Sequence, residues 1–116
     1  MIMPGISIHV VDVSRGLVAA GMPVELHGSD GTLIAKGALA ADGTLDDPAL
    51  AQTFAAGAYR ATFHVGAYYC GTGVALPAVP FLDVVTYDFG IANPAQHYHL
   101  PFKCTPWGYS CFRGGA

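Results

Sequence analysis

Short runs of β-branched and aromatic residues, interrupted by Gly, Pro or Asp, make up most of the chain. The runs favour strands and the interruptions favour turns, a pattern that is typical of an all-β sandwich. Seven strands are expected, over residues 6–12, 23–27, 33–39, 59–65, 81–91, 97–104 and 109–113. One short helix is expected over 47–55, whereas the segment 65–72 is too short and too rich in bounding glycine to be assigned. The sequence therefore predicts an antiparallel sandwich of seven or eight strands, in one domain spanning residues 1–116.

The charge content limits the partners that such a domain can have. Hydrophobic residues make up 53% of the chain and charged residues only 11%, less than half the usual charged share. No apolar run is long enough to span a bilayer, so the low charge predicts a surface covered by further copies of the chain. The five Lys and Arg residues are scattered and the formal net charge is −3, which argues against a nucleic-acid partner.

The first five residues and the cysteines bear on the compartment. Met1 to Gly5 contain neither a cationic nor an apolar stretch, so no signal peptide is predicted. Cys70, Cys104 and Cys111 form an odd set without close pairing motifs, which favours reduced thiols and a cytoplasmic location. Cys104 and Cys111 are expected to face each other across a hairpin, mainly as buried free thiols, with a cross-strand disulfide as the alternative.

Alternation along the strand 97–104 separates two kinds of side chain. One face is expected to carry His97, His99, Pro101 and Lys103, and the other, which suits the core, Tyr98, Leu100, Phe102 and Cys104. In the first strand, Ile6, Ile8 and Val10 form the core face, and Ser7, His9 and Val11 point away from it. His9 and His99 are therefore predicted on the outer faces of strands that could be neighbours.

The residue pattern alone leaves three interpretations of these histidines open. They could be solvated or hydrogen-bonded surface residues. They could form a general-base pair, because a neutral imidazole accepts a proton from water near neutral pH. His9, His97 and His99 could also ligate a metal, but no carboxylate or further histidine lies at close spacing, so neither a metal nor a cofactor is predicted.

Five segments together form a recognisable set. They are 8–12 (IHVVD), 63–68 (FHVGAY), 80–85 (PFLDVV), 97–101 (HYHLP) and 105–115 (TPWGYSCFRGG). In this order, and over nearly the whole chain, they resemble the motifs of the transthyretin-like family, specifically its 5-hydroxyisourate hydrolase branch.

The resemblance implies a fold, an assembly and an activity. The fold is a sandwich of two four-stranded sheets with one short helix, assembled as a homotetramer whose active sites lie where two dimers meet. The implied reaction adds water to a ring carbonyl of the small molecule 5-hydroxyisourate and opens its six-membered ring, in urate catabolism and without a cofactor. By the same resemblance His9 and His99 activate and orient the water. The resemblance also implies that Arg113 and the tail help to shape the site. The full substrate-binding set is predicted as Thr44, His97, Lys103, Ser110, Phe112 and Arg113.

The chain departs from the hydrolase pattern after the Asp-Gly turn, in the tail and at Lys103. Hydrolases carry an arginine after the Asp-Gly turn, where this chain has Thr44, and their tail Tyr-Arg-Gly-Ser is replaced by residues 112–115 (FRGG), with Ala116 beyond. Threonine cannot clamp a carbonyl-rich substrate as a guanidinium does, and loss of such a donor costs on the order of 10²–10³ in rate. Lys103, at a position that is aliphatic in the hydrolases, is predicted to supply part of the missing charge. The alternative is that Lys103 is merely solvated.

These departures leave other functions open. The chain could act on a related ring, for example an N-methylated analogue of 5-hydroxyisourate. It could instead be a diverged cyclase or isomerase on another small ring substrate, or a non-catalytic binder of small ligands. Retention of both His9 and His99 favours chemistry over binding alone.

Overall fold

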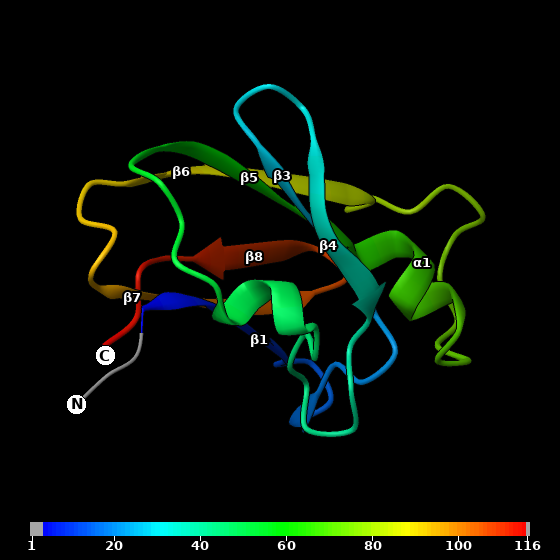
Figure 1. Cartoon of the computed structure of the whole chain (residues 1–116). Coiled ribbons are helices and arrows are strands. Elements are labelled where there is room, and N and C mark those ends of the chain that lie inside the picture. The colour runs from blue at the N-terminus through cyan, green and yellow to red at the C-terminus, as the bar shows by residue number, and fades with distance from the viewer. Residues whose placement is uncertain (1–3, 116) are drawn as a thin grey trace.

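Two four-stranded sheets face each other across the core of the computed structural model, which describes residues 4–115 (Figure 1). The first sheet has the order β2-β1-β7-β8 and consists of β1 (Gly5–Asp12), β2 (Leu17–Val18), β7 (His97–Thr105) and β8 (Gly108–Cys111). The second has the order β4-β3-β5-β6 and consists of β3 (Pro23–Gly28), β4 (Leu33–Ala38), β5 (Gly57–His64) and β6 (Val84–Ile91). The predicted all-β sandwich with two four-stranded sheets is confirmed.

One strand pair departs from the antiparallel pattern that the sequence predicts. β1 and β7 run parallel, with Ser7 opposite His99 and His9 opposite Pro101, whereas the other paired strands are antiparallel. Parallel neighbours need a long connection and leave no hairpin signal in the local sequence. This pair joins the two ends of the chain and places His9 and His99 on adjacent strands.

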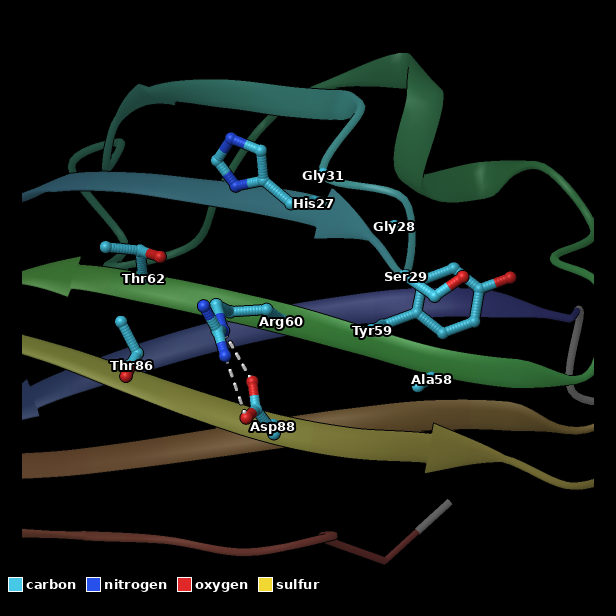
Figure 2. A pocket seen from close by; sticks show the side chains of 10 residues that line it. All are labelled: His27, Gly28, Ser29, Gly31, Ala58, Tyr59, Arg60, Thr62, Thr86 and Asp88. Atoms are coloured by element: carbon cyan, nitrogen blue, oxygen red, sulfur yellow. Dashed lines mark hydrogen bonds and ion pairs between the residues drawn. The ribbon is translucent and has the colours of Figure 1, made fainter.

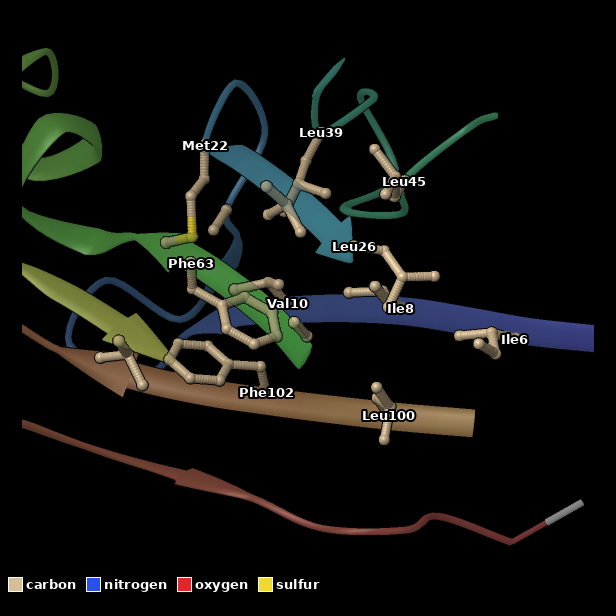
Figure 3. Close-up of a cluster of buried hydrophobic side chains, with 14 of the residues drawn as sticks. Ile6, Ile8, Val10, Met22, Leu26, Leu39, Leu45, Phe63, Leu100 and Phe102 are labelled. Carbon is tan, nitrogen blue, oxygen red and sulfur yellow. The ribbon is translucent and has the colours of Figure 1, made fainter. Parts of the chain in front are cut away.

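The core faces of β1 and β7 are those that the alternation predicts. Ile6, Ile8 and Val10 of β1 are buried, as are Tyr98, Leu100, Phe102 and Cys104 of β7. The rings of Phe63 on β5 and Phe102 on β7 stack with centroids 3.9 Å apart and join the two sheets (Figure 3). Because one face of each strand is committed to the core, the intervening side chains, including those of Ser7, His9 and His99, point out of the sandwich.

The helical segments are shorter than expected. Instead of a helix over 47–55, a 3₁₀ turn, η1 (Pro48–Ala51), follows Asp47, whose carboxylate accepts a bond from the backbone N–H of Ala49 over 2.9 Å. The segment left unassigned in the sequence contains the short helix α1 (Val65–Cys70). No helix within residues 4–115 combines the length and apolar character that crossing a membrane requires.

Strand boundaries also differ from the prediction, and one strand was not predicted at all. β6 begins at Val84 rather than at residue 81, because the backbone carbonyl of Asp83 accepts a bond from Gly66 at the start of α1, over 2.9 Å. β2 has only two residues, too few to leave a periodic pattern. β8 ends at Cys111, and residues 112–115 form a tail without regular secondary structure rather than a continuation of the strand.

The two hairpin cysteines do not face each other as predicted. Cys104 lies opposite Tyr109, and Cys111 lies opposite Phe102, because the turn between β7 and β8 fixes a different register. All three cysteines are free thiols. Burial raises the pKa of both Cys104 and Cys111 to about 11, so these two thiols stay protonated near neutral pH.

A buried carboxylate ties α1 to the end of β1. Asp12 is fully buried and accepts hydrogen bonds from the hydroxyls of Ser14, Tyr68 and Tyr69, over 2.6, 3.0 and 2.6 Å. Burial acts to raise the pKa of Asp12, but the three hydroxyl donors outweigh it, and the net pKa is lowered. The carboxylate is therefore a charged structural centre on the side of β1 away from the outward-facing histidines.

Candidate active site

A serine joins two of the predicted site histidines. The hydroxyl oxygen of Ser7 lies 2.6 Å from Nδ1 of His99 and 2.8 Å from Nε2 of His97. The parallel register sets this contact, since Ser7 is directly opposite His99 and both side chains leave the sheet on the same face. A hydroxyl has one proton to donate, so Ser7 donates to one imidazole and accepts from the other.

His9 is held from the turn that precedes Thr44. Its Nε2 lies 3.0 Å from the backbone carbonyl oxygen of Asp42. A carbonyl can only accept, so Nε2 of His9 is the donor, and a neutral His9 keeps its lone pair on Nδ1. The turn itself depends on Gly43, which has φ +81°, and whose Cβ, if present, would lie 2.8 Å from Cβ of Val18.

The turn brings Thr44 beside His9 but ties its side chain to the turn. Thr44 pairs with His9 in an isolated β-bridge. Its hydroxyl and backbone N–H both donate to Oδ1 of Asp42, over 2.7 and 3.1 Å. These bonds lower the pKa of Asp42. Where the family resemblance implies an arginine, the chain thus has a neutral hydroxyl bound to a carboxylate.

His99 is the histidine whose surroundings favour the neutral form. It is half-buried in the face of β7. Burial lowers its pKa most, the neighbouring His9 and His97 lower it further, and a hydrogen bond with the backbone of Ser7 opposes them. A neutral imidazole with an accessible nitrogen can accept a proton from water. His99 is therefore chemically suited to act as a general base.

The C-terminal tail runs back along β7 and packs on His99. The N–H of Gly114 donates to the carbonyl of His99 over 2.8 Å. A Cβ on Gly114 would lie 2.8 Å from Cδ2 of His99 and 2.8 Å from Cγ of Pro101. Only a residue without a side chain allows this approach, so Gly114 sets the position of the tail against the imidazole.

Arg113 is engaged at the start of β7. Its guanidinium lies 4.0 Å from the ring centroid of Tyr98 and donates to the Gln96 side chain and the His97 carbonyl, each over 3.2 Å. These contacts anchor the tail. The substrate-binding role that the resemblance implies for Arg113 stays a prediction.

Lys103, Ser110 and Phe112 form an exposed patch further along the same face. Lys103 lies opposite Ser110 in the β7–β8 register, so both leave the sheet on the face that carries His99. The Lys103 ammonium lies 6.0 Å from the ring centroid of Phe112. The structure thus places the predicted cation on the histidine face, over an aromatic ring of the tail. Ala116, the last tail residue named above, lies outside the described residues.

Two hollows differ in how they relate to the histidines. One, of about 270 Å³, is lined by Ser7, Thr44 and His97 together with residues of η1. The other, of about 500 Å³, lies on the outer face of the opposite sheet (Figure 2). There Arg60 and Asp88 form a two-bond ion pair, over 2.6 and 3.0 Å, and neutralise each other. The smaller hollow is the one that adjoins Ser7, Thr44 and His97 of the predicted site.

The arrangement does not assemble a metal site from the described residues. Within 4–115, no group of three His, Cys, Asp or Glu side chains is placed to hold a metal ion. His97 and His99 each direct a nitrogen at Ser7, and His9 directs one at a backbone carbonyl.

Sequence reasoning identified the histidines but missed three residues that hold them. Ser7 was assigned only to an outer face, Asp42 only to a turn, and Gly114 only to a tail motif. Their roles depend on contacts that span 92, 33 and 15 positions of sequence. One signal could have identified Ser7. It is two residues before His9, so the two share a face of a strand that pairs with the HYH segment.

Comparison with known proteins identifies the family of the chain. The HIUase/Transthyretin family model matches residues 6–114. The 5-hydroxyisourate hydrolase of Deinococcus radiodurans is 41% identical over 115 residues, covering 96% of both chains. That of Pseudomonas aeruginosa is 39% identical over 116 residues, covering 97% of this chain and 92% of the other.

Solved structures agree with this assignment. The 5-hydroxyisourate hydrolase of Klebsiella pneumoniae superposes with a TM-score of 0.79 at 31% identity and covers 97% of this chain and 100% of the other. An (S)-allantoin synthase structure gives a TM-score of 0.88 at 35% identity over 96% of this chain, which spans 43% of that longer one. By sequence and by fold, the chain belongs to the HIUase/transthyretin family.

Proposed function

We propose that the protein is a cofactor-independent hydrolase that opens the ring of 5-hydroxyisourate or a closely related analogue. The observation that carries the proposal is the cluster of His9, Ser7 and His99 on one outer sheet face, in which His99 is half-buried and favours the neutral form. Relatives that match nearly the whole chain bear the name 5-hydroxyisourate hydrolase, which supports the same substrate class.

The proposed chemistry uses the nitrogen of His99 that Ser7 does not contact. Nε2 of His99 takes a proton from water while the water oxygen forms a bond to a ring carbonyl carbon. The carbonyl π electrons move to oxygen and give a tetrahedral oxyanion. When the oxyanion collapses, the ring C–N bond breaks and the proton on Nε2 passes to the departing nitrogen. His9, fixed by the carbonyl of Asp42, orients the water or the substrate.

Thr44 and Lys103 set the proposed substrate preference. Thr44 offers a hydroxyl bound to Asp42 and carries no charge, whereas Lys103 places an ammonium on the histidine face beside Phe112. We assign Lys103, Ser110 and Phe112 to substrate binding. An N-methylated ring lacks one hydrogen-bonding site, so it is a substrate for which the absent arginine matters less.

The proposed assembly is a homotetramer, a dimer of dimers in a cytoplasmic, reducing compartment. The β7–β8 hairpin and the tail expose large apolar surfaces, with Trp107, Tyr109 and Phe112 exposed by 58, 50 and 44%. Apolar residues gathered in this way favour a covered interface. The three free thiols are consistent with the compartment.

The test is the rate of ring opening of 5-hydroxyisourate by the purified protein and three alanine variants. His99→Ala is expected to reduce kcat by about 10²–10⁴, the range for loss of a general base, and His9→Ala to reduce it strongly. His27→Ala, which removes a half-buried histidine from the outer face of the other sheet, is the matched control and should leave the rate unchanged. A wild-type protein without activity on the substrate or its N-methyl analogues would refute the proposal.

A further inference from the structure

We propose that Ser7 and His97 are positioning residues that hold His99 in the one tautomer able to act as a base. The inference rests on the proposed function and adds a role for two residues. Its starting point is the three-membered chain His97 Nε2 – Ser7 Oγ – His99 Nδ1, with contacts of 2.8 and 2.6 Å.

The chain of hydrogen bonds can run in two directions. If Ser7 donates to His99, then Nδ1 of His99 holds the lone pair, and its Nε2 carries the proton in the neutral ring. In that state Nε2, the nitrogen away from Ser7, has no free lone pair and cannot accept a proton. If Ser7 donates to His97, then His99 donates from Nδ1 to Ser7, and its Nε2 keeps the lone pair. Only the second direction supports the proposed chemistry.

The second direction also accommodates both protonation states of His99. When Nε2 of His99 takes the proton from water, Nδ1 is already donating to Ser7, so no hydroxyl has to rotate. In the first direction the charged ring would present an N–H to the hydroxyl proton of Ser7, which is repulsive. The protons on Ser7 and His97 stay in place throughout, so the two residues position the base and do not relay a proton.

His97 is what makes the productive direction favourable. A neutral His97 with its proton on Nδ1 offers Nε2 as an acceptor, and the Ser7 hydroxyl has this acceptor at 2.8 Å. The tail holds the strand backbone at both histidines, through Arg113 at the His97 carbonyl and Gly114 at the His99 carbonyl. Both rings contact the Ser7 hydroxyl, which gives His97 a role other than substrate contact.

Other titratable groups lie around the hydrogen-bond chain of His97, Ser7 and His99 but take no part in it. His9 on β1 is held by the carbonyl of Asp42, and Lys103 lies further along β7, opposite Ser110. Asp46 and Asp47 line the hollow that Ser7 and His97 share. Within residues 4–115, no hydrogen bond joins these groups to the Ser7 hydroxyl, so the two imidazoles decide the direction of the hydrogen-bond chain.

The first measurement needs no substrate and reads the tautomer directly. In protein labelled with nitrogen-15 histidine, two-bond proton–nitrogen correlation spectra above the pH at which His99 titrates should show neutral His99 with its proton on Nδ1. In His97→Leu, where the acceptor is gone, the His99 population should shift toward the Nε2–H form. A wild-type His99 protonated on Nε2 would overturn the inference, whatever the activity.

The second measurement is kinetic. Ser7→Ala and His97→Leu should each reduce kcat at least about 10-fold with KM changed less than about 2-fold, since they act on the base and not on binding. The double variant should be no worse than the worse single variant, because the two residues act as one unit. Ser7→Thr keeps the hydroxyl in a residue that suits a strand and should restore most of kcat.

The controls separate this inference from the proposed function. Thr86→Ala removes an exposed hydroxyl from the outer face of β6 and should change nothing. An active wild type with a fully active Ser7→Ala variant would overturn the positioning role and leave the hydrolase proposal standing. A wild type inactive on every ring tested would refute the hydrolase, and the tautomer spectra would then decide the positioning role alone.

Discussion

The backbone N–H of Gly114 donates to the carbonyl of His99 over 2.8 Å, and this bond lays the C-terminal tail against the imidazole of the proposed base. The tail follows β8, which is only four residues long. It is also held by Arg113, which donates to the backbone carbonyl of His97. The geometry of the site therefore depends on Gly114 having no side chain.

Gly114→Ala is expected to reduce kcat about 10-fold or more, since the added methyl group would lie 2.8 Å from His99 and Pro101 and a small displacement of a base is costly. Gly115→Ala is the matched control, because nothing lies within 4 Å of its added Cβ. The measurements are the two rate constants and the unfolding temperatures. Equal rates for the two variants would show that the tail position is unimportant.

The pH profile should report His99. As a base it must be neutral, so kcat/KM should fall as pH decreases through a pKa below the ordinary value of about 6.5, lowered by burial first and then by His9 and His97. The same shift affects stability. Folded His99 binds a proton less readily than the unfolded chain does, so its contribution is complete above about pH 6.5 and is lost below it. A rate independent of pH from 5 to 8 would contradict the role.

Lys103→Leu is expected to raise KM on the native substrate, because the ammonium beside Phe112 is the cation placed on the histidine face of β7. Lys36→Leu, on β4 of the other sheet, removes an exposed lysine as the control. If both variants behave as wild type on every ring tested, Lys103 does not compensate for the missing arginine.

Thr44→Arg is expected to increase activity on 5-hydroxyisourate, because it restores a guanidinium beside His9, at the isolated bridge. The gain should lie within the 10²–10³ that one transition-state donor typically supplies. The assay compares 5-hydroxyisourate with its N-methyl analogues. A loss on all of them would mean that the bond from Thr44 to Asp42 matters more to the turn than a new cation does to the substrate.

Tyr69→Phe is expected to destabilise the fold by roughly 1.5–3 kcal/mol, since it removes a 2.6 Å bond to the buried Asp12 carboxylate. Tyr87→Phe, at a half-buried tyrosine of β6, should cost less than about 0.5 kcal/mol. Chemical denaturation measures both. The Asp12 contribution should be present above the unfolded pKa of about 3.9 and decline as pH falls toward the lowered folded value.

Light scattering at micromolar concentration should give four times the 12.0 kDa mass of the chain. Trp107 is the single tryptophan, and it is 58% exposed in one chain. An interface that covers the hairpin should therefore shift its fluorescence to shorter wavelength relative to a dissociated or unfolded sample. A monomeric mass would refute the tetramer.

The sequence determined the elements whose signal is local. Alternation in 6–12 and 97–104 correctly separated the core side chains from Ser7, His9, His97 and His99, because the side-chain period of a strand is two whatever its neighbours are. A helical turn does follow Asp47, where the helix 47–55 was expected to begin, since capping depends on the next two residues. The motif order also identified the family that the comparisons then showed.

Tertiary structure alone decided which of these faces meet. The parallel pairing of β1 and β7 aligns Ser7 with His99 across 92 positions of sequence, and no local rule specifies such a register. The same holds for Asp42 at His9, for Arg113 at Tyr98 and for the hairpin register that separates Cys104 from Cys111. The local sequence determines on which face of a strand each side chain lies. The energy of packing two whole sheets fixes which side chains become partners, and the proposed site depends on those partners.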